Sequence, residues 1–241
     1  MWRHVVGSLI GPWLQQDKRA GQTLEPLPSP KKNDRIMFFA PHPDDEVCAA
    51  GAYLAAAAKV GASAMVVLVT DANSRGYGET RRQEFEQVLI KLGVTEKRYF
   101  NFAEGELSNS SAELKTACEE IIDEYRPTVV IIPHPEDLHS DHAAVGEVVS
   151  HITHQTSIMT LAFPDHFPPQ YPSPRGYRPD LYLLPPSSIA NRYHWTSFSV
   201  SPELQRLKTE AMKEYRLELR TPVLRSHMLS SIRKNELFAK L

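Results

Sequence analysis

Short apolar runs alternate along the chain with longer stretches in which apolar residues recur every three or four positions. The runs are rich in β-branched and large apolar side chains, as strands buried on both faces of a sheet require. Each is four to eight residues long, the usual length of a buried strand. The sequence therefore predicts strands at 35–40, 63–70, 127–133 and 156–163.

The stretches between these runs have the period of a helix. Apolar residues share one face in each of three segments, 44–59, 79–92 and 111–125. The second segment ends at Gly93, which suits a helix C-terminus, and the third is stopped by Pro127. Strands separated by helices predict right-handed crossovers. The expected fold class is therefore α/β, with three layers: a mostly parallel sheet and helices on both of its faces.

Two segments depart from this alternation. Residues 164–186 hold eight of the 19 prolines and end in a run that predicts an edge strand. Such a long excursion inside a domain is typical of a binding loop or a disordered segment. Residues 21–34 are Pro-rich and charged, and predict a linker, while a last helix is expected over 202–219. The predicted organisation is an N-terminal arm and linker at 1–34 and a single domain at 35–241.

Composition excludes several classes of protein. The 241 residues are 41% hydrophobic and 23% charged, which suits one large globular domain. A net charge of −2 argues against nucleic acid as a partner. Cys48 and Cys118 lie far apart, so a disulfide framework is not expected, and a reducing compartment fits. The apolar N-terminus is too short to span a bilayer, so the protein is expected to be cytoplasmic, with peripheral membrane contact through the arm left open.

Two polar clusters follow predicted strands. PHPDDE comes directly after the first strand, and PHPEDLHSDH comes directly after the third. In open parallel sheets, ligands bind beyond the carboxyl ends of the strands. The clusters provide one histidine–acid pair spaced three apart and one H-x-D-H motif, which comprise His42, Asp45, His139, Asp141 and His142.

These residue types in this pattern favour a metal site. Two imidazole nitrogens and one carboxylate oxygen form a three-ligand zinc site with the fourth position open, which is the catalytic arrangement. Taken singly, each cluster is also compatible with a plain helix start, because acids complement the helix dipole and Pro43 suits a first helical position. Their coincidence at one edge of the predicted sheet favours the metal site.

The motifs resemble those of the LmbE-like deacetylases, the family of GlcNAc-phosphatidylinositol de-N-acetylase (PIG-L). The resemblance covers roughly residues 35–240 and implies the family's Rossmann-like fold. One departure is the helix after the first motif, which is rich in alanine where the family is rich in glycine. The similar stretches are PHPDDE at 41–46, TDANSRGYGETRRQEF at 70–85, LGV at 92–94, DLHSDH at 137–142, KTEAMKEYRLE at 208–218 and IRKNELF at 232–238.

The resemblance implies one zinc ion per chain, held by His42, Asp45 and His142. Zinc in such a site lowers the pKa of a water molecule toward ~7 and polarises the carbonyl of an amide. Asp44 is the adjacent carboxylate that does not bind the metal. It is therefore the candidate base that accepts the proton of the attacking water.

Further roles follow from the same resemblance. His139 is expected to stabilise the oxyanion or to protonate the leaving amine, with Asp141 orienting its imidazole. Arg81 matches an arginine that lies near the substrate in the family, although its sequence context also fits a solvated helix face. Asp165 and His166, in the Pro-rich excursion, are weaker candidates for the mouth of the site.

The implied function is that of a zinc-dependent hydrolase acting on a carbon–nitrogen bond other than a peptide bond. It would remove the N-acetyl group from a GlcNAc-type (2-acetamido sugar) glycoconjugate and release acetate and a free amine. The alternatives are a metal-dependent amidase acting on a mycothiol- or bacillithiol-type thiol–sugar conjugate or another N-acyl substrate, and a binding protein with a vestigial metal site. The presence of both Asp44 and His139 argues against the last. The expected partner is an N-acetylated amino-sugar substrate, and a homo-oligomer is left open.

Overall fold

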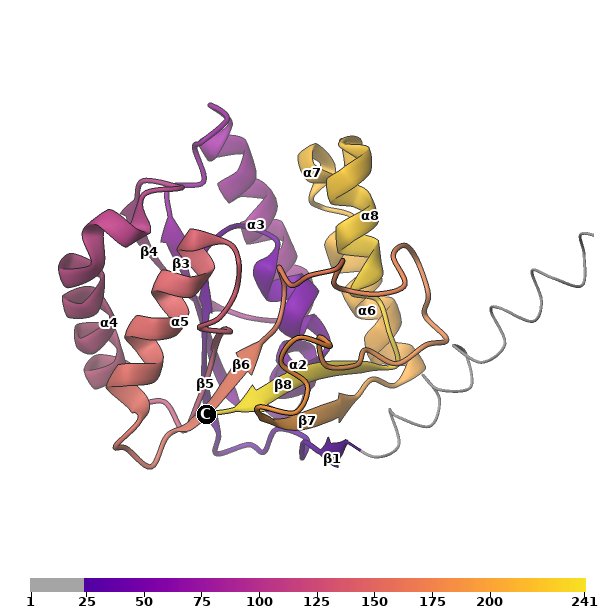
Figure 1. Cartoon of the computed structure of the whole chain (residues 1–241), viewed down its shortest axis with the longest axis horizontal. Helices are drawn as coiled ribbons and strands as arrows, with labels where there is room; N and C mark the ends of the chain where they lie inside the picture. The colour runs from indigo at the N-terminus through magenta and orange to yellow at the C-terminus, as the bar shows by residue number, and fades with distance from the viewer. Residues whose placement is uncertain (1–23) are drawn as a thin grey trace, which may run out of the picture.

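A single mixed sheet runs through the computed structural model, which describes residues 24–241 (Figure 1). In this part of the chain the sheet has eight strands in the order β1-β7-β8-β6-β5-β2-β3-β4. All neighbouring strands pair in parallel except those beside β8, which is antiparallel to both β6 and β7. The strands are β1 (Glu25–Pro26), β2 (Arg35–Ala40), β3 (Ser63–Thr70), β4 (Glu96–Phe102), β5 (Val129–Pro133), β6 (Met159–Phe163), β7 (His194–Ser199) and β8 (Asn235–Lys240).

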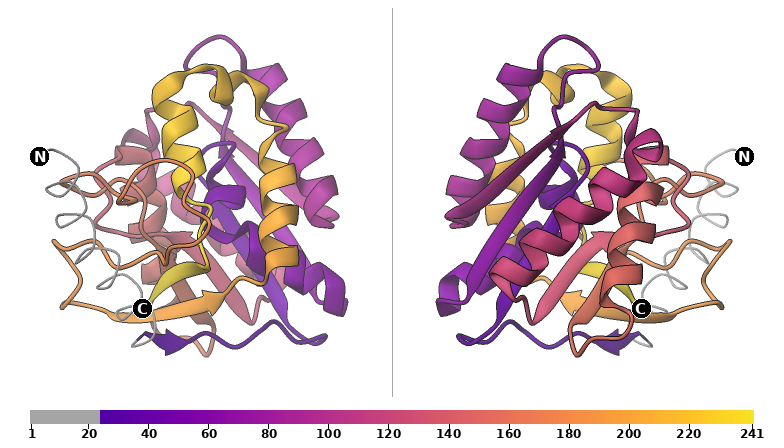
Figure 2. Two further views of the ribbon diagram at one scale, coloured as in Figure 1. Left: turned by 90° about the vertical axis from the view of Figure 1, so that its right-hand side faces the viewer. Right: turned by 90° about the vertical axis from the view of Figure 1, so that its left-hand side faces the viewer.

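Helices cover both faces of this sheet, as the two side views of Figure 2 show. Side chains of β2 alternate between two cores: Ile36 and Phe38 pack in one, and Met37 and Phe39 in the other. The first core includes side chains of α2, α3 and α6, and the second includes side chains of α4 and α5. The expected three-layer α/β fold is confirmed. The helices are α2 (Asp45–Val60), α3 (Gly78–Leu92), the 3-10 helix η1 (Leu107–Ser110), α4 (Ser111–Tyr125), α5 (Ser140–Thr153), α6 (Pro202–Met212), α7 (Arg216–Arg220) and α8 (Pro222–Ser230).

The structure corrects several of the predicted elements. No strand forms within 164–186; the edge strand predicted there is wrong, and β7 begins only at His194. The buried Arg233 side chain donates hydrogen bonds to backbone carbonyls of this excursion, including that of Gly176 at 3.2 Å, so these groups are occupied outside any sheet. The last predicted helix ends at Met212 and is followed by the separate helices α7 and α8.

Part of the predicted linker belongs to the sheet. Residues Glu25 and Pro26 form β1, which pairs in parallel with β7, and Leu27 is buried in the first core. The N-terminal arm lies largely outside the described residues, which begin at residue 24. Among the described residues no helix is long and apolar enough to cross a membrane. Neither Cys48 nor Cys118 forms a disulfide, as the sequence predicts.

Helix α2, which follows the first motif, is interrupted at Ala50, where the backbone is not helical (φ −139°, ψ 19°). A buried ion pair satisfies the backbone groups that the break exposes. Lys208 donates a hydrogen bond to the carbonyl of Cys48 (2.7 Å) and pairs with Glu236 (2.8 Å). Glu236 in turn accepts hydrogen bonds from two backbone N–H groups just after the break, at 2.8 Å each. The C-terminal quarter of the chain therefore fixes the helix that carries the first motif.

Candidate active site

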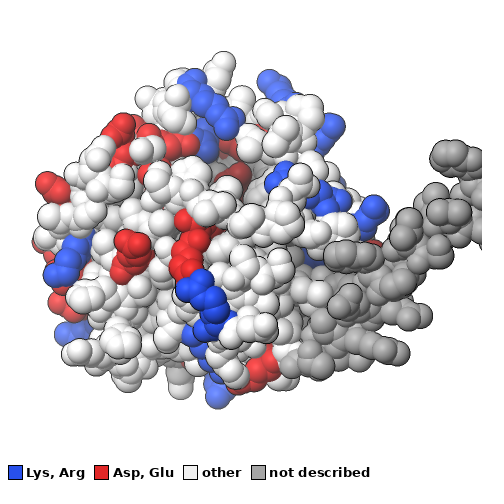
Figure 3. All heavy atoms as spheres, in the orientation of Figure 1, with Lys and Arg blue, Asp and Glu red and all other residues white. Residues whose placement is uncertain are grey.

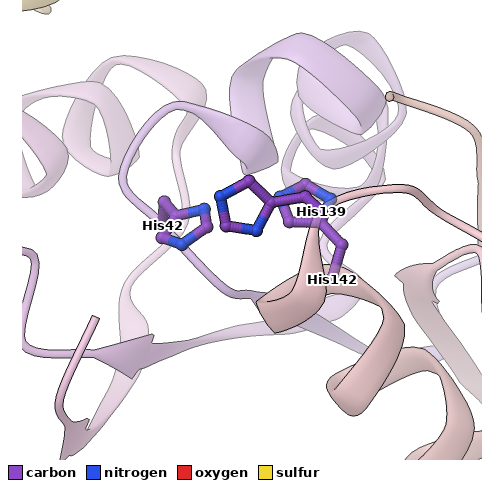
Figure 4. Close-up of side chains that lie close together, drawn as sticks. All are labelled: His42, His139 and His142. Carbon is purple, nitrogen blue, oxygen red and sulfur yellow. The ribbon is translucent and has the colours of Figure 1, made fainter. Parts of the chain in front are cut away.

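The two histidine-containing motifs meet because β2 and β5 are neighbours in the sheet. His42 lies in the turn after β2, whereas His139 and His142 lie at the N-terminus of α5, after β5. Figure 4 shows the three rings turned toward one another. Their centroids are 4.7 to 5.3 Å apart, and one nitrogen of each lies within 4.8 Å of the others. Packing in the sheet thus brings together residues about one hundred positions apart.

Gly146 allows α5 to approach the end of β5. A Cβ atom at this position would lie 2.6 Å from the carbonyl oxygen of Pro133 and 2.9 Å from the backbone of Pro135. Any side chain would therefore push the helix away from the strand. Because His142 is one turn before Gly146 on the same helix, this close contact sets the depth of His142 in the site.

Asp45 completes the predicted set of ligands. Its Oδ1 atom lies 3.3 Å from His142 Nε2, and its Oδ2 atom lies 3.8 Å from His42 Nδ1. The backbone N–H of His42 donates a hydrogen bond to the same Oδ2 atom (2.7 Å) and fixes the carboxylate. All three side chains are buried, with exposed fractions of 8% or less.

His142 shows that this group suits a cation. Both of its ring nitrogens are fully buried and make no hydrogen bond with the described residues. Nε2 faces Asp45, and Nδ1 lies 3.7 Å from Asp137. Burial lowers the pKa of His142, but the two carboxylates outweigh burial and hold that pKa well above its usual value. The site thus stabilises a positive charge between Asp45 and His142, and a metal ion bound there would replace the proton.

Asp141 contacts a different histidine from the one expected. We expected its carboxylate to orient His139, but it accepts hydrogen bonds from His42 Nε2 (3.0 Å) and from the backbone N–H groups of Gly105 (2.7 Å) and Leu107 (3.3 Å). It is the backbone N–H of Asp141 that donates to His139 Nδ1 (3.2 Å). The carboxylate therefore orients a candidate ligand histidine, as acidic partners commonly do at zinc sites.

Asp44 lies next to these groups in an unusual backbone conformation. Its φ angle of 106° is in the left-handed region that favours glycine, which is a local strain of the kind found at functional sites. Its carboxylate makes no hydrogen bond with the described residues, whereas its backbone N–H donates to Glu46. Burial, and then the nearby Asp45 and Glu218 carboxylates, raise the pKa of Asp44 well above its usual value. This carboxylate is therefore suited to hold a proton in the site.

Glu46 does more than favour the start of a helix. It is fully buried, accepts a hydrogen bond from the Tyr215 hydroxyl (2.6 Å), and accepts another from the backbone N–H of Asp44 (3.2 Å). Burial raises the pKa of Glu46 to about 8. The left-handed turn at Asp44 is thereby tied to the segment that precedes α7.

The chain matches the model of a known family. Residues 37–153 match the family described as GlcNAc-PI de-N-acetylase (PIG-L). This stretch begins in β2 and ends with α5, so it contains both histidine–acid motifs. The chain is therefore similar to the GlcNAc-PI de-N-acetylase family over just under half of its length. This similarity supports a deacetylase, which is a hydrolase.

Solved structures share the fold of this chain. The zinc-inhibited form of teicoplanin deacetylase has a TM-score of 0.65 and 20% identity, over 86% of this chain and 97% of the other. N,N'-diacetylchitobiose deacetylase from Pyrococcus horikoshii, in complex with an inhibitor, has a TM-score of 0.60 and 17% identity, over 100% of this chain and 93% of the other. The 4-carboxy-2-hydroxymuconate hydratase from Pseudomonas putida has a TM-score of 0.53 and 15% identity, over 86% of this chain and 94% of the other. No curated protein matches the chain. Because one of these structures is a hydratase, the fold by itself does not determine the reaction.

Arg81 is buried rather than on a solvated helix face. Its side chain is 6% exposed and pairs with Glu218 (2.8 Å) and Glu104 (2.7 Å), and it donates to the carbonyl of Ala72 (2.9 Å). The interpretation as a solvated face is therefore wrong. Arg81 lies close enough to Asp44 for their charges to interact. A contact between Arg81 and the substrate stays a prediction.

Asp137 is a component of the site that is not among the residues expected from the sequence. Its buried carboxylate accepts hydrogen bonds from the backbone N–H groups of His139 and His166, both at 2.9 Å. It also lies 3.1 Å from His166 Nδ1 and faces His142. The signal was present in DLHSDH, where Asp137 precedes His139 by two residues.

The Pro-rich excursion reaches the site at its beginning. Oxygen and nitrogen atoms of Asp165, Asp45 and His142 lie within 4.8 Å of one another, and the ring of His166 lies 4.8 Å from that of His142. The weaker candidates Asp165 and His166 are thus confirmed as neighbours of the site. His227, on α8, contacts Asp165 and was not predicted, because a lone histidine in a helical segment carries no motif.

His134 lies beside the site but is buried among aromatic rings. Its ring stacks on Trp195, with centroids 6.1 Å apart, and meets Tyr193 edge to face. Its Nδ1 atom accepts the backbone N–H of Glu136 (3.1 Å), whereas its buried Nε2 atom has no hydrogen-bond partner among the described residues. Burial lowers the pKa of His134 to about 4.

This low pKa predicts a loss of stability in acid. Between about pH 6.5 and pH 4 the unfolded chain binds a proton at His134 that the folded chain does not. The stability is therefore full above about pH 6.5 and falls as the pH drops toward 4. Between pH 7.5 and pH 5.0, we expect the free energy of unfolding of His134→Phe to fall by about 1–2 kcal/mol less than that of the wild type. Urea unfolding of both proteins at the two pH values, in the presence of a chelator, measures this difference. An equal fall in the free energy of unfolding of both proteins would contradict the prediction.

Proposed function

We propose that this protein is a zinc-dependent N-deacetylase acting on a 2-acetamido sugar of the GlcNAc type, within a glycoconjugate. It would hydrolyse the acetamide and release acetate and a free amine. The family match supports the class of reaction, and the deacetylases that share the fold are consistent with an acetylated sugar as substrate. The identity of the metal and the class of substrate are the steps that the proposal adds.

The observation that carries the proposal is the convergence of three metal-binding side chains beside two groups suited to proton chemistry. His42, Asp45 and His142 provide two nitrogens and one carboxylate oxygen, which zinc prefers in catalytic sites. Asp44 and His139 lie at the same end of the sheet and are not needed as ligands. A purely structural metal site would not require them.

Carboxylates outside the ligand set face both candidate ligand histidines. Asp141 accepts from His42 Nε2, which leaves Nδ1 of that ring for the metal. Asp137 faces His142 Nδ1, which leaves Nε2 for the metal. Zinc bound there would polarise the amide carbonyl and acidify water. The hydrogen bond to Asp141 would set the tautomer and orientation of His42, whereas Asp137 acts on His142 through its charge.

His139 is positioned to stabilise an oxyanion. Its Nδ1 atom accepts the N–H of Asp141, so the neutral ring carries its proton on Nε2 and donates from there. Burial, together with the neighbouring His42 and His142, lowers the pKa of His139 to about 4, so the ring is neutral at pH 7. Of the two roles considered for His139, this geometry favours donation to the developing oxyanion over delivery of a full proton.

Asp44 then accounts for both proton transfers. As a carboxylate it accepts a proton from the attacking water, and as the acid it returns that proton to the leaving amine. The raised pKa of Asp44, caused by burial and by the nearby carboxylates, is consistent with its holding a proton in this site. Buried Arg81, held by Glu218 and Glu104, places positive charge near Asp44 and favours its ionised form.

The charges on one face of the molecule give no sign of a polyanion as substrate. On the face drawn in Figure 3, acidic and basic side chains of the described residues lie interspersed, without a broad field of one sign. A polyanion would need a continuous basic surface. The net charge of −2 is consistent with this.

The experiment is an assay of released acetate with N-acetylglucosamine presented free, as a disaccharide and linked to phosphatidylinositol, together with an N-acetylated thiol–sugar conjugate. We expect acetate from at least one acetamido sugar, complete loss of activity after chelation, and recovery with zinc. About one tightly bound zinc ion per chain is expected after purification. His142→Ala should abolish both the tightly bound zinc and the activity.

His154→Ala is the matched control, because His154 is exposed at the end of the same helix. It should behave as the wild type does. Acetate release that survives chelation would contradict the proposed metal dependence. Full zinc occupancy in His142→Ala would contradict the ligand assignment.

A further inference from the structure

A second group of metal-binding side chains lies beside the first. Asp165 and His166 follow β6 directly, and His227 comes from α8, about sixty residues later (Figure 1). Asp165 Oδ1 lies 2.8 Å from His227 Nε2, and Asp165 Oδ2 lies 3.2 Å from His166 Nδ1. One ligand atom of each residue lies within 4.8 Å of the other two.

The geometry of this group suits a small cation. The two imidazole rings are nearly parallel, with an angle of 12° between their planes and centroids 5.6 Å apart, and the carboxylate contacts a nitrogen of each. The distances of 2.8 and 3.2 Å are close to the separation of about 3.3 Å between ligand atoms of a tetrahedral ion with bonds of about 2.0 Å. Side-chain exposures of 16% for Asp165, 17% for His227 and 39% for His166 leave the group open to solvent on one side.

His166 also shows why a positive ion belongs here. Its Nδ1 atom lies between two carboxylates, Asp137 at 3.1 Å and Asp165 at 3.2 Å. The two carboxylates repel each other unless a positive charge lies between them. A metal ion supplies that charge in place of a proton when it binds imidazole and carboxylate ligands.

We propose that Asp165, His166 and His227 bind a second divalent cation of the zinc type, next to the site formed by His42, Asp45 and His142. Two nitrogens and one oxygen are a zinc-type donor set. Asp165 also lies within 4.8 Å of ligand atoms of Asp45 and His142, so this carboxylate links the two sites. The second site binds more weakly than the first, because it is half-exposed and its carboxylate is shared. Binding of an ion at this second site does not depend on the reaction or on the substrate.

The test counts zinc rather than activity. The full chain is stripped with a chelator and dialysed against buffers of rising free zinc, and bound zinc is measured by elemental mass spectrometry. We expect the wild type to bind one equivalent tightly and a second at higher free zinc. His227→Gln and His166→Gln should each stop at one equivalent. Glutamine can still donate a hydrogen bond to Asp165, so both variants are expected to fold, which circular dichroism checks.

Two further variants separate the possible failures. His142→Ala should lose the tight equivalent and keep the weaker one, so failure of the first site is distinguishable from failure of the second. His154→Gln, at an exposed position, should bind two equivalents as the wild type does. The proposal is overturned if the wild type saturates at one equivalent. It is also overturned if His227→Gln and His166→Gln both retain two, or if His154→Gln loses the second.

Discussion

Asp44→Asn is expected to lower the turnover number by about 10²–10⁴-fold while the zinc content stays at the wild-type level. Asparagine has nearly the size of aspartate but cannot accept the proton of the attacking water. It should keep the backbone hydrogen bond from Asp44 to Glu46, and no ligand is removed. The measurement combines steady-state kinetics of acetate release with metal analysis of the same sample.

Asp123→Asn is a suitable control for this change, because Asp123 is exposed on α4, on the opposite face of the sheet from α2. It should leave both quantities unchanged. If Asp44→Asn works at near-normal rate, the proposed base is wrong. If it is inactive because its zinc is lost, Asp44 acts in holding the metal instead.

Glu236→Ala is expected to destabilise the protein by about 3–5 kcal/mol. The change leaves the Lys208 ammonium, which is 2% exposed, without its carboxylate. It also removes the acceptor of two backbone N–H groups at the break in α2. Buried groups that lose their partners are costly, because water cannot replace the lost hydrogen bonds. Urea unfolding at pH 7.5, in a chelator to remove the contribution of bound metal, measures the change.

Glu203→Ala provides the comparison, because Glu203 forms a surface ion pair with Lys59 and its side chain is 64% exposed. Its removal should cost less than about 1 kcal/mol. A loss of similar size in the two variants would refute the distinct role of the buried pair. Because Glu236 braces the helix after the first motif, Glu236→Ala should also weaken zinc binding, whereas Glu203→Ala should not.

Local patterns in the sequence determined the framework of the fold. The apolar runs that became β2, β3, β5 and β6 are long and uninterrupted, because these strands are buried on both faces. The strands that were missed lie elsewhere in the sheet. β4 is an edge strand with exposed positions, and β7 and β8 contain polar residues whose partners lie far away in the chain. Their pairing depends on tertiary packing rather than on local pattern.

The sequence by itself also placed two histidine–acid motifs at strand ends. An apolar run followed at once by a cluster of polar residues can be recognised within one short segment of sequence. Only the tertiary structure decided how those groups pair: Asp141 with His42, and Asp137 with His142 and His166. It also brought His227 from α8 to Asp165, and Glu236 from β8 to the break in α2. These contacts join residues up to 184 positions apart. They follow from how the helices and the sheet pack, which local periodicity does not encode.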